Sequence, residues 1–127
     1  MKNPYIIPSL IIAAAILGGF WMVKPPPQPP DISIHQAAKE GNIVAVKQHL
    51  AAGTNVNVRD KYGSTPLWWA ARSGRKEIPE LLIAKGADLN AKDDAGTTPL
   101  DWAYGETADL LRKHGGKTSE ELKAEGK

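Results

Sequence analysis

The chain has 127 residues and a formal net charge of +2, and it contains no cysteine. The excess positive charge comes from Lys2 and Lys24, because the residues from Asp31 onward carry 14 basic and 14 acidic side chains. A balanced domain of this kind lacks the basic stripe of a nucleic-acid-binding protein, so no nucleic-acid partner is expected. The lack of cysteine excludes disulfides, thiolate nucleophiles and cysteine metal sites.

Residues 5–23 carry no charge and are rich in Ile, Leu, Ala and Gly, with Lys2 and Lys24 on either side. As a helix they would reach roughly 28 Å, close to the ~30 Å hydrocarbon thickness of a bilayer. Cleavage as a signal peptide at the small residues 13–15 would leave an apolar stub on the mature protein. Residues 1–24 are therefore predicted to be one retained N-terminal transmembrane helix. A cleaved signal segment and a secreted protein are the alternative.

The charges at the two ends of this segment slightly favour an N-terminus inside the cell. The expectation is a single-pass membrane protein whose repeat domain is extracytoplasmic. The pairs Ala14/Gly18 and Ala15/Gly19 have the small-residue spacing that lets two membrane helices pack closely. Weak self-association through the anchor is therefore a further hypothesis.

Residues 25–30 are almost all proline. They are predicted to form an extended polyproline II rod with a rise of about 3.1 Å per residue. We interpret the rod as a stiff linker between the anchor and the following domain. A ligand for a proline-binding domain is the alternative.

The rest of the chain repeats itself at an offset of 33 residues, from Gly63 to Gly96. The Gly, Thr, Pro and Leu of residues 63–67 recur in residues 96–100, and a weaker copy begins near Ile34. A period this long indicates a repeating supersecondary unit.

Each unit is predicted to be a turn followed by two short helices. In the second unit, Thr65 suits the N-cap, Pro66 suits the first helical position and Gly74 ends the first helix. A second helix is expected over residues 77–83, where apolar residues follow spacings of three and four, and Gly86 ends it. Helices this short are unstable alone, so the units must stack into an all-α solenoid.

Residues 65–71 and 85–90 resemble the helix-opening motif and the closing loop of the ankyrin-repeat family. The resemblance covers roughly residues 32–116. It implies an ankyrin-repeat solenoid of about three helix-turn-helix units over residues 31–117, with atypical first and third units.

The sequence departs from the family pattern in two respects. The family's histidine position holds His35 in the first unit, Trp68 in the second and Asp101 in the third. The third unit also lacks four residues, because Leu110 aligns with Leu81 at an offset of 29 instead of 33. Either the connection between its two helices is compressed or its first helix is cut short.

Both ends of the stack carry the spacing of a capping box. Ser33 with Gln36, and Thr118 with Glu121, place a hydroxyl three residues before a longer polar side chain. Residues 118–127 are predicted to form a short C-terminal helix that covers the end of the stack. A solvated tail is the alternative.

Nothing in the chain has the pattern of a catalytic or metal site. His35, His49 and His114 share no ligand spacing, and the adjacent carboxylates of Asp93 and Asp94 are expected to be a solvated pair in a turn. There is no nucleophile elbow and no phosphate-binding glycine loop. We therefore expect no enzyme activity, no catalytic residue, no metal and no cofactor.

The resemblance also implies a binding surface, since ankyrin stacks grip other proteins with the concave face formed by their turns and first helices. Carried over position by position, this face is rich in Trp, Tyr and Arg, the residues that dominate interface hot spots. Trp68 is instead interpreted as packing between units. The predicted partner-binding residues are Arg59, Lys61, Tyr62, Ser64, Trp69, Arg72, Ser73, Lys92, Asp94, Ala95, Thr97, Trp102 and Tyr104.

The function predicted from the sequence is a membrane-tethered protein–protein interaction module that binds a partner protein through the concave face. The alternative is a structural accessory subunit of a membrane complex that acts mainly through its anchor. The scaffold does not specify which protein is bound.

Overall fold

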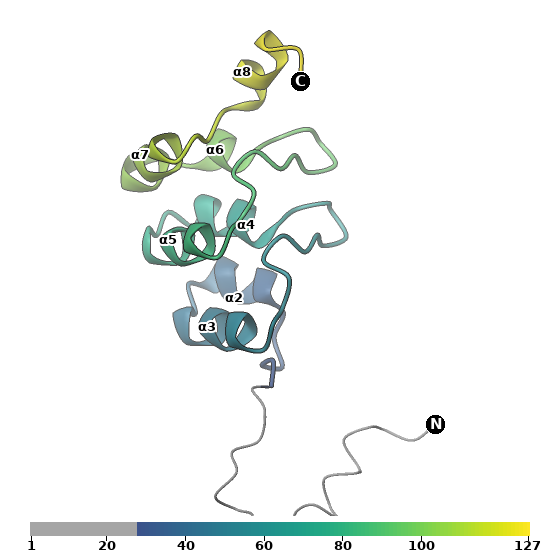
Figure 1. The fold of residues 1–127 in the computed structure, drawn as a ribbon, viewed down its shortest axis with the longest axis vertical. Helices are drawn as coiled ribbons and strands as arrows, with labels where there is room; N and C mark the ends of the chain where they lie inside the picture. The colour runs from purple at the N-terminus through teal and green to yellow at the C-terminus, as the bar shows by residue number, and fades with distance from the viewer. Residues whose placement is uncertain (1–27) are drawn as a thin grey trace, which may run out of the picture.

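The computed structural model describes residues 28–127, and these form seven helices joined by loops (Figure 1). The helices are, in chain order, α2 (Ile34–Glu40), α3 (Ile43–Ala51), α4 (Pro66–Ser73), α5 (Glu77–Ala84), α6 (Pro99–Trp102), α7 (Gly105–Lys113) and α8 (Ser119–Ala124).

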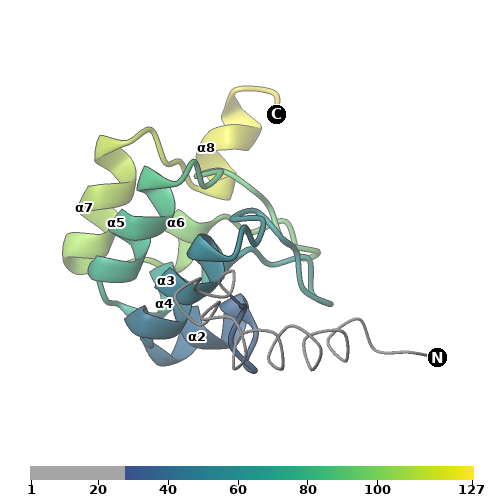
Figure 2. The same cartoon turned by 60° about the horizontal axis from the view of Figure 1, so that its bottom comes forward.

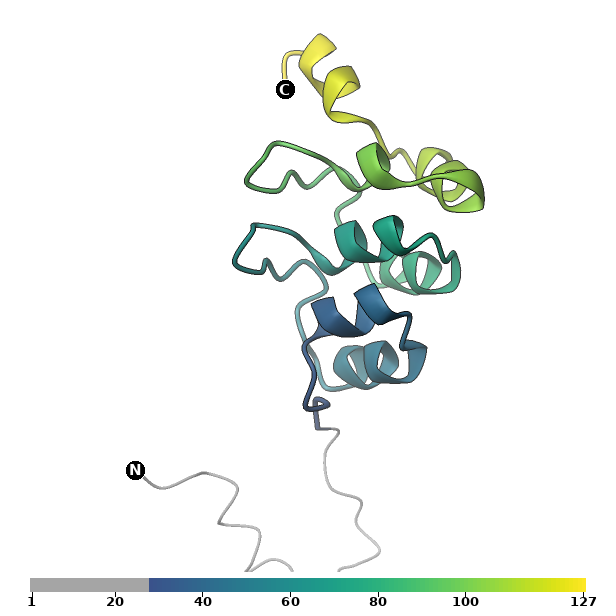
Figure 3. The ribbon, with the colours of Figure 1, turned by 180° about the vertical axis from the view of Figure 1, so that it is seen from behind.

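Three helix pairs lie one above another, and α8 follows at the C-terminal end of the stack (Figure 1). The first helices α2, α4 and α6 form one column, and the second helices α3, α5 and α7 form another. The loops that precede α4 and α6, residues 52–65 and 85–98, project on the side away from the second helices (Figures 1 and 3). The view in Figure 2 shows the same separation of the two columns from the loops.

Small side chains allow the first helices to pack closely. Ala37 and Ala38 of α2 and Ala70 and Ala71 of α4 are all 0 % exposed. An alanine has no atom beyond Cβ, so two helix backbones can approach each other through such positions. One cluster of buried apolar residues continues through the whole stack, from the first pair to Leu111 of α7.

The predicted helix signals of the second unit are confirmed. The Thr65 hydroxyl accepts a hydrogen bond from the Trp68 amide at 3.3 Å, and Pro66 opens α4. Gly74 caps the C-terminus of α4 with φ +76°, in the left-handed region that favours glycine.

The capping boxes at the two ends differ. Thr118 and Glu121 form a complete capping box at α8. The prediction for the first unit is only half right, because Ser33 Oγ accepts from the Gln36 amide but the Gln36 side chain donates to Glu40 Oε1 at 2.6 Å instead of returning to Ser33.

The four-residue deletion in the third unit shortens its first helix. Helix α6 has 4 residues, whereas its counterpart α4 has 8. The hydrogen bond that joins each closing loop to the following one is present in both units despite the deletion. The side chain of Asn57 accepts from the amide of Asp88, 31 residues on, and that of Asn90 accepts from the amide of Lys117, 27 residues on. The two separations differ by the four missing residues.

Three different side chains at the family's histidine position connect each unit to the one after it. His35 Nε2 donates to the carbonyl oxygen of Val58 at 2.8 Å, and Trp68 Nε1 donates to Thr97 Oγ1 at 3.1 Å. In the third unit, the Asp101 carboxylate accepts from the amide of Ser119, at the start of α8, at 3.1 and 3.2 Å.

The C-terminal helix is held against the third unit by buried and polar contacts. Leu122 of α8 is 5 % exposed, and Thr98 Oγ1 donates to the carbonyl oxygen of Lys117 at 2.7 Å. Arg112 of α7 forms an ion pair with Glu121 at 2.9 Å. These contacts support a covering role for α8.

The predicted fold class needs one correction. No helix within residues 28–127 is long and apolar enough to cross a bilayer, since the longest, α3 and α7, have 9 residues and a crossing needs about 20. The transmembrane helix predicted for residues 1–24 and the self-association through it lie outside the described residues. Neither that helix nor a single-pass membrane location with an extracytoplasmic repeat domain is supported, and the accessory role that depended on the anchor loses its basis.

The link between Asp101 and α8 leads to a stability prediction. Replacement Asp101→Ala removes the acceptor for the amides of Thr98 and Ser119. The free energy of unfolding should fall by about 1–2 kcal/mol, which thermal melts would detect. Asp109→Ala, at an exposed position of α7, is the matched control and should melt close to the wild-type temperature.

Replacement Ser119→Pro isolates the bond to α8. Proline is favoured at the first helical position, and Thr118 before it has φ −76° and ψ 163°, which a following proline accepts. The variant loses only the donated bond to Asp101. A melting temperature equal to that of the wild type would contradict the view that this bond holds α8 on the stack.

Candidate functional site

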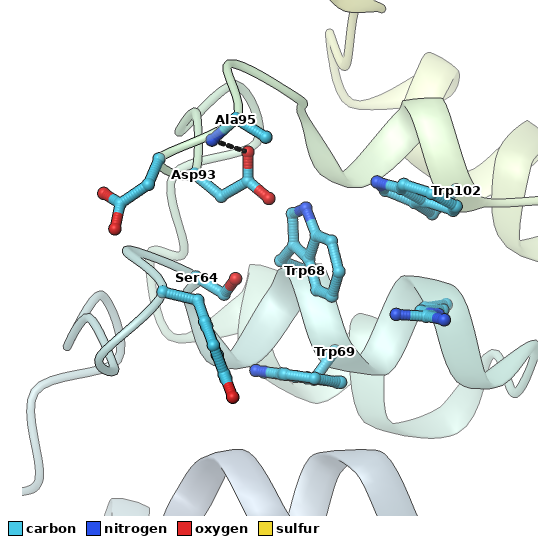
Figure 4. Close-up of a pocket in the computed structure, with 9 residues that line it drawn as sticks. Ser64, Trp68, Trp69, Asp93, Ala95 and Trp102 are labelled. Atoms are coloured by element: carbon cyan, nitrogen blue, oxygen red, sulfur yellow. Dashed lines mark hydrogen bonds between the residues drawn. The ribbon is translucent and has the colours of Figure 1, made fainter.

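The first helices and the two projecting loops frame two adjacent depressions. The smaller, which we name the basic pocket, has a volume of about 320 Å³ and is lined by Lys39, Trp69, Arg72 and Ser73. The larger, which we name the aromatic groove, has a volume of about 450 Å³ (Figure 4). Trp69 and Arg72 line both, so these two side chains form the common boundary of the depressions. The aromatic groove is lined by Tyr62, Ser64, Trp68, Trp69, Arg72, Asp93, Asp94, Ala95 and Trp102.

Three tryptophans from two helices meet in the aromatic groove (Figure 4). The ring centroids of Trp68 and Trp69 are 4.9 Å apart with an interplanar angle of 75°, an edge-to-face contact. The centroids of Trp68 and Trp102 are 5.8 Å apart. Trp68 is 5 % exposed, as its predicted packing role requires, whereas Trp102 is 42 % exposed.

One hydroxyl group holds two of these rings. Thr97 Oγ1 accepts hydrogen bonds from Trp68 Nε1 and from Trp102 Nε1, both at 3.1 Å. A threonine oxygen has two lone pairs, so these indoles use its full capacity as an acceptor. Thr97 therefore fixes the orientation of the rings on either side of the boundary between the second and third units.

Cationic side chains lie over the aromatic rings. The Arg72 guanidinium carbon is 5.1 Å from the ring centroid of Trp102 and 5.7 Å from that of Trp68. Lys39 Nζ is 5.3 Å from the centroid of Trp69. Lys61 Nζ is 5.1 Å from the centroid of Tyr62. These contacts are within cation–π range and orient the charges on the face that the sequence predicts for binding.

Asp60 organises the first projecting loop and one side of the aromatic groove. Its Oδ1 accepts from the amides of Tyr62 and Ser64 at 2.9 and 3.0 Å. Its Oδ2 accepts from Trp69 Nε1 at 2.8 Å. Burial of this carboxylate raises its pKa, but the hydrogen bonds from the indole and the two amides outweigh burial, and the pKa of Asp60 lies below its ordinary value.

Asp93 has the same position in the third unit. Its Oδ1 accepts from the amides of Ala95 and Thr97 at 3.1 and 2.8 Å (Figure 4). The prediction of two solvated carboxylates is therefore right for Asp94, which is exposed, and wrong for Asp93, which accepts hydrogen bonds from its own loop.

The two projecting loops touch each other. The Asp94 amide donates to the Tyr62 carbonyl oxygen at 3.0 Å. Gly63 has φ +74°, and a Cβ atom there would lie 2.4 Å from Asp94 Oδ1 and 3.0 Å from the Asp94 amide nitrogen. Glycine at this position allows the close approach, and the loops form one continuous edge of the aromatic groove.

The remaining predicted residues make contacts within the chain. Arg59 donates to the carbonyl oxygens of Gly63 and Lys92 at 2.8 and 2.6 Å, and Lys92 Nζ donates to the Lys127 carbonyl oxygen at 3.1 Å. Tyr104 is 62 % exposed, and its hydroxyl lies close to Gly74. None of these residues lines either depression.

Three residues that line the depressions were absent from the predicted binding set: Trp68, which was assigned to packing, Lys39 and Asp93. Lys39 lines the basic pocket and lies one repeat period of 33 residues before Arg72, so the repeat offset could have identified it. Asp93 lines the aromatic groove. Ser64, although predicted as a contact, is only 1 % exposed and lies at the floor of the groove.

The histidines of the first unit have structural partners. His35 bonds to Val58 as described above, and His49, 7 % exposed, bonds to the Ile32 carbonyl oxygen at 2.6 Å and to the Thr54 hydroxyl at 3.1 Å. Within residues 28–127 there is no group of three or more His, Asp or Glu side chains that could hold a metal ion.

A comparison with known protein families gives the same result as the architecture described above. A family model described as ankyrin repeats in three copies matches residues 34–121. The chain belongs to the ankyrin-repeat family. Proteins of this family typically act as interaction modules and not as enzymes.

Individual relatives match only part of the chain. Acyl-CoA-binding domain-containing protein 4 of Oryza sativa subsp. japonica is 49% identical over 49 residues, which are 39% of this chain and 15% of that protein. Osteoclast-stimulating factor 1 of Rattus norvegicus is 44% identical over 52 residues, which are 41% of this chain and 24% of that protein. The chain thus spans about a quarter or less of the length of these curated relatives, and the matches are too short to carry over either protein's function.

Asp60 provides a test of how the aromatic groove is built. In Asp60→Asn, an NH2 group, which only donates, replaces one carboxylate oxygen, so the side chain can no longer accept from both Trp69 and the loop amides. The free energy of unfolding at pH 7 should fall by about 1–2 kcal/mol, and Trp69 should shift its fluorescence as its indole loses its partner. In the matched control Asp93→Asn both loop bonds persist, because Asp93 receives them on one oxygen.

Comparison of the wild type with Asp60→Asn also predicts how the stability depends on pH. Folding lowers the pKa of Asp60. The contribution of Asp60 to stability is therefore fully present above the pKa of the unfolded chain, about 3.9, and is lost as the pH falls through the pKa of the folded protein. The stability difference between the wild type and Asp60→Asn should therefore narrow below about pH 4. A difference that stays constant down to the acid transition would contradict this role.

Proposed function

We propose that the chain binds a partner protein through the aromatic groove and the adjoining basic pocket. The observation that carries this proposal is that three tryptophans (Figure 4) line one groove together with Tyr62 and Arg72. Trp, Tyr and Arg are the residue types that contribute most to binding energy in protein interfaces.

The exposure of these rings supports binding in addition to packing. Four large hydrophobic side chains are exposed within residues 28–127, and two of them, Tyr62 at 55 % and Trp102 at 42 %, line the aromatic groove. Each exposed ring presents apolar surface to water, and a partner that covered this surface would gain binding energy.

The rings are also held in place before any partner arrives. The nitrogen of each of the three indoles donates to a side chain of the same fold, Trp69 to Asp60 and the other two to Thr97. A surface fixed in this way loses little conformational freedom on binding, so more of the contact energy contributes to affinity.

The double variant Tyr62→Ala/Trp102→Ala tests the proposal. Both truncations remove exposed ring surface from the aromatic groove, and they should abolish recovery of the partner in affinity purification with the full chain. Val44→Ala is the matched control, because Val44 is 62 % exposed on α3, in the column of second helices. Circular dichroism must show the same helix content in all three proteins. A partner recovered equally well by a folded groove variant would show that the surface is elsewhere.

A further inference from the structure

We propose that the segment bound in this groove is acidic, with a carboxylate side chain beside a bulky apolar one. The carboxylate pairs with Arg72 and Lys39 in the basic pocket, and the apolar side chain lies in the aromatic groove between Tyr62 and Trp102. The proposal rests on the proposed function and adds the chemistry of the partner.

The basic pocket contains positive charge without a carboxylate to balance it. Lys39 and Arg72 line it together with Trp69 and Ser73, and no acidic residue does. The Ser73 hydroxyl donates to the Ala70 carbonyl oxygen at 2.8 Å. A ligand that enters this pocket therefore meets two cations and the face of an indole.

The two cations have no ionic partner in the part of the chain that the structure describes. The ion pairs found there join Lys76 to Glu106, Arg112 to Glu121, and Glu125 to both Lys117 and Lys127. Within residues 28–127 the charged groups of Lys39 and Arg72 lie over aromatic rings and form no hydrogen bond or ion pair. Their hydrogen-bond donors remain available to an incoming anion.

The position of Arg72 suits a carboxylate in particular. Its guanidinium lies beside the indoles of Trp102 and Trp68, with its carbon 5.1 and 5.7 Å from their ring centroids, so two rings restrict its position. A guanidinium held in this way can present two parallel N–H groups to the two oxygens of one carboxylate. Ring contact also lowers the cost of removing the cation from water when a ligand covers it.

The opposite end of the aromatic groove selects against a more highly charged ligand. Asp93 and Asp94 line that end, and Asp94 is exposed. A phosphorylated segment carries close to two negative charges and is usually bound by a cluster of arginines. One arginine and one lysine near two aspartates favour a singly charged carboxylate. The acidic end of the segment should therefore lie over α2 and α4, with a neutral or basic end near residues 93–95.

The experiment uses the full chain as bait for a displayed library of random peptides. Enriched peptides are synthesised with each Asp or Glu intact or replaced by its amide, and their affinities are measured by titration. We expect enrichment of an acidic residue next to an aromatic or aliphatic one. Replacing that carboxylate by its amide should weaken binding by about tenfold or more.

Variants of the bait locate the effect. Lys39→Gln/Arg72→Gln should weaken the acidic peptides by about tenfold or more and remove the dependence on salt. Arg72→Lys keeps the charge but loses the planar fork, and it should also weaken binding. The control Lys47→Gln/Lys113→Gln changes the net charge equally at two exposed positions of the second helices α3 and α7 and should bind like the wild type.

The outcomes separate this proposal from the proposed function. Peptides that lose binding in Tyr62→Ala/Trp102→Ala but need no carboxylate, such as proline-rich ones, would overturn the acidic specificity and leave the groove as the binding site. Occupation of the groove by a second copy of the chain, seen as concentration-dependent self-association, would do the same. Failure to enrich any peptide that depends on the groove would count against both.

Discussion

The packing of one helix pair against the next is the interaction on which the rest of this structure depends. No helix within residues 28–127 exceeds 9 residues, a length that is unstable in water on its own. Stability therefore comes from contacts between units, above all between α2, α4 and α6 (Figure 1). The buried alanines of α2 and α4 allow these helices to approach closely, and the turn glycines let the loops fold back at each boundary.

The same register that buries the apolar sides also places equivalent positions in a row on the loop side of the stack. His35, Trp68 and Asp101 occupy one such row and connect each unit to its successor through three different chemistries. The next row along brings the aromatic side chains Trp69 and Trp102 to the surface. The binding face is thus a consequence of the repeat, and its specificity comes from the positions at which the units differ.

Much of this fold could be predicted from the sequence because the repeat places Thr, Pro and Gly at positions with a local physical meaning. The two ends of α4 follow from Thr65, Pro66 and Gly74 alone. Whether the third unit lost a connection or part of a helix could not be decided, since both explanations align equally well. Asp93 accepts from amides only two and four residues on, so its equivalence to Asp60 in the repeat could have shown its role in the loop. The length of the apolar segment predicted a membrane helix at residues 1–24, which lie outside the described residues. Within residues 28–127 no helix is long and apolar enough to cross a bilayer.

Hydrogen exchange of the full chain with and without a bound partner tests the central claim most directly. If the stack presents the aromatic groove and basic pocket to a partner, exchange should slow in α4, α6 and the loops 52–65 and 85–98. Exchange in α3, α5 and α7, on the other side of the first helices, should stay unchanged beyond any general gain in stability. Protection confined to α3, α5 and α7 would contradict the account.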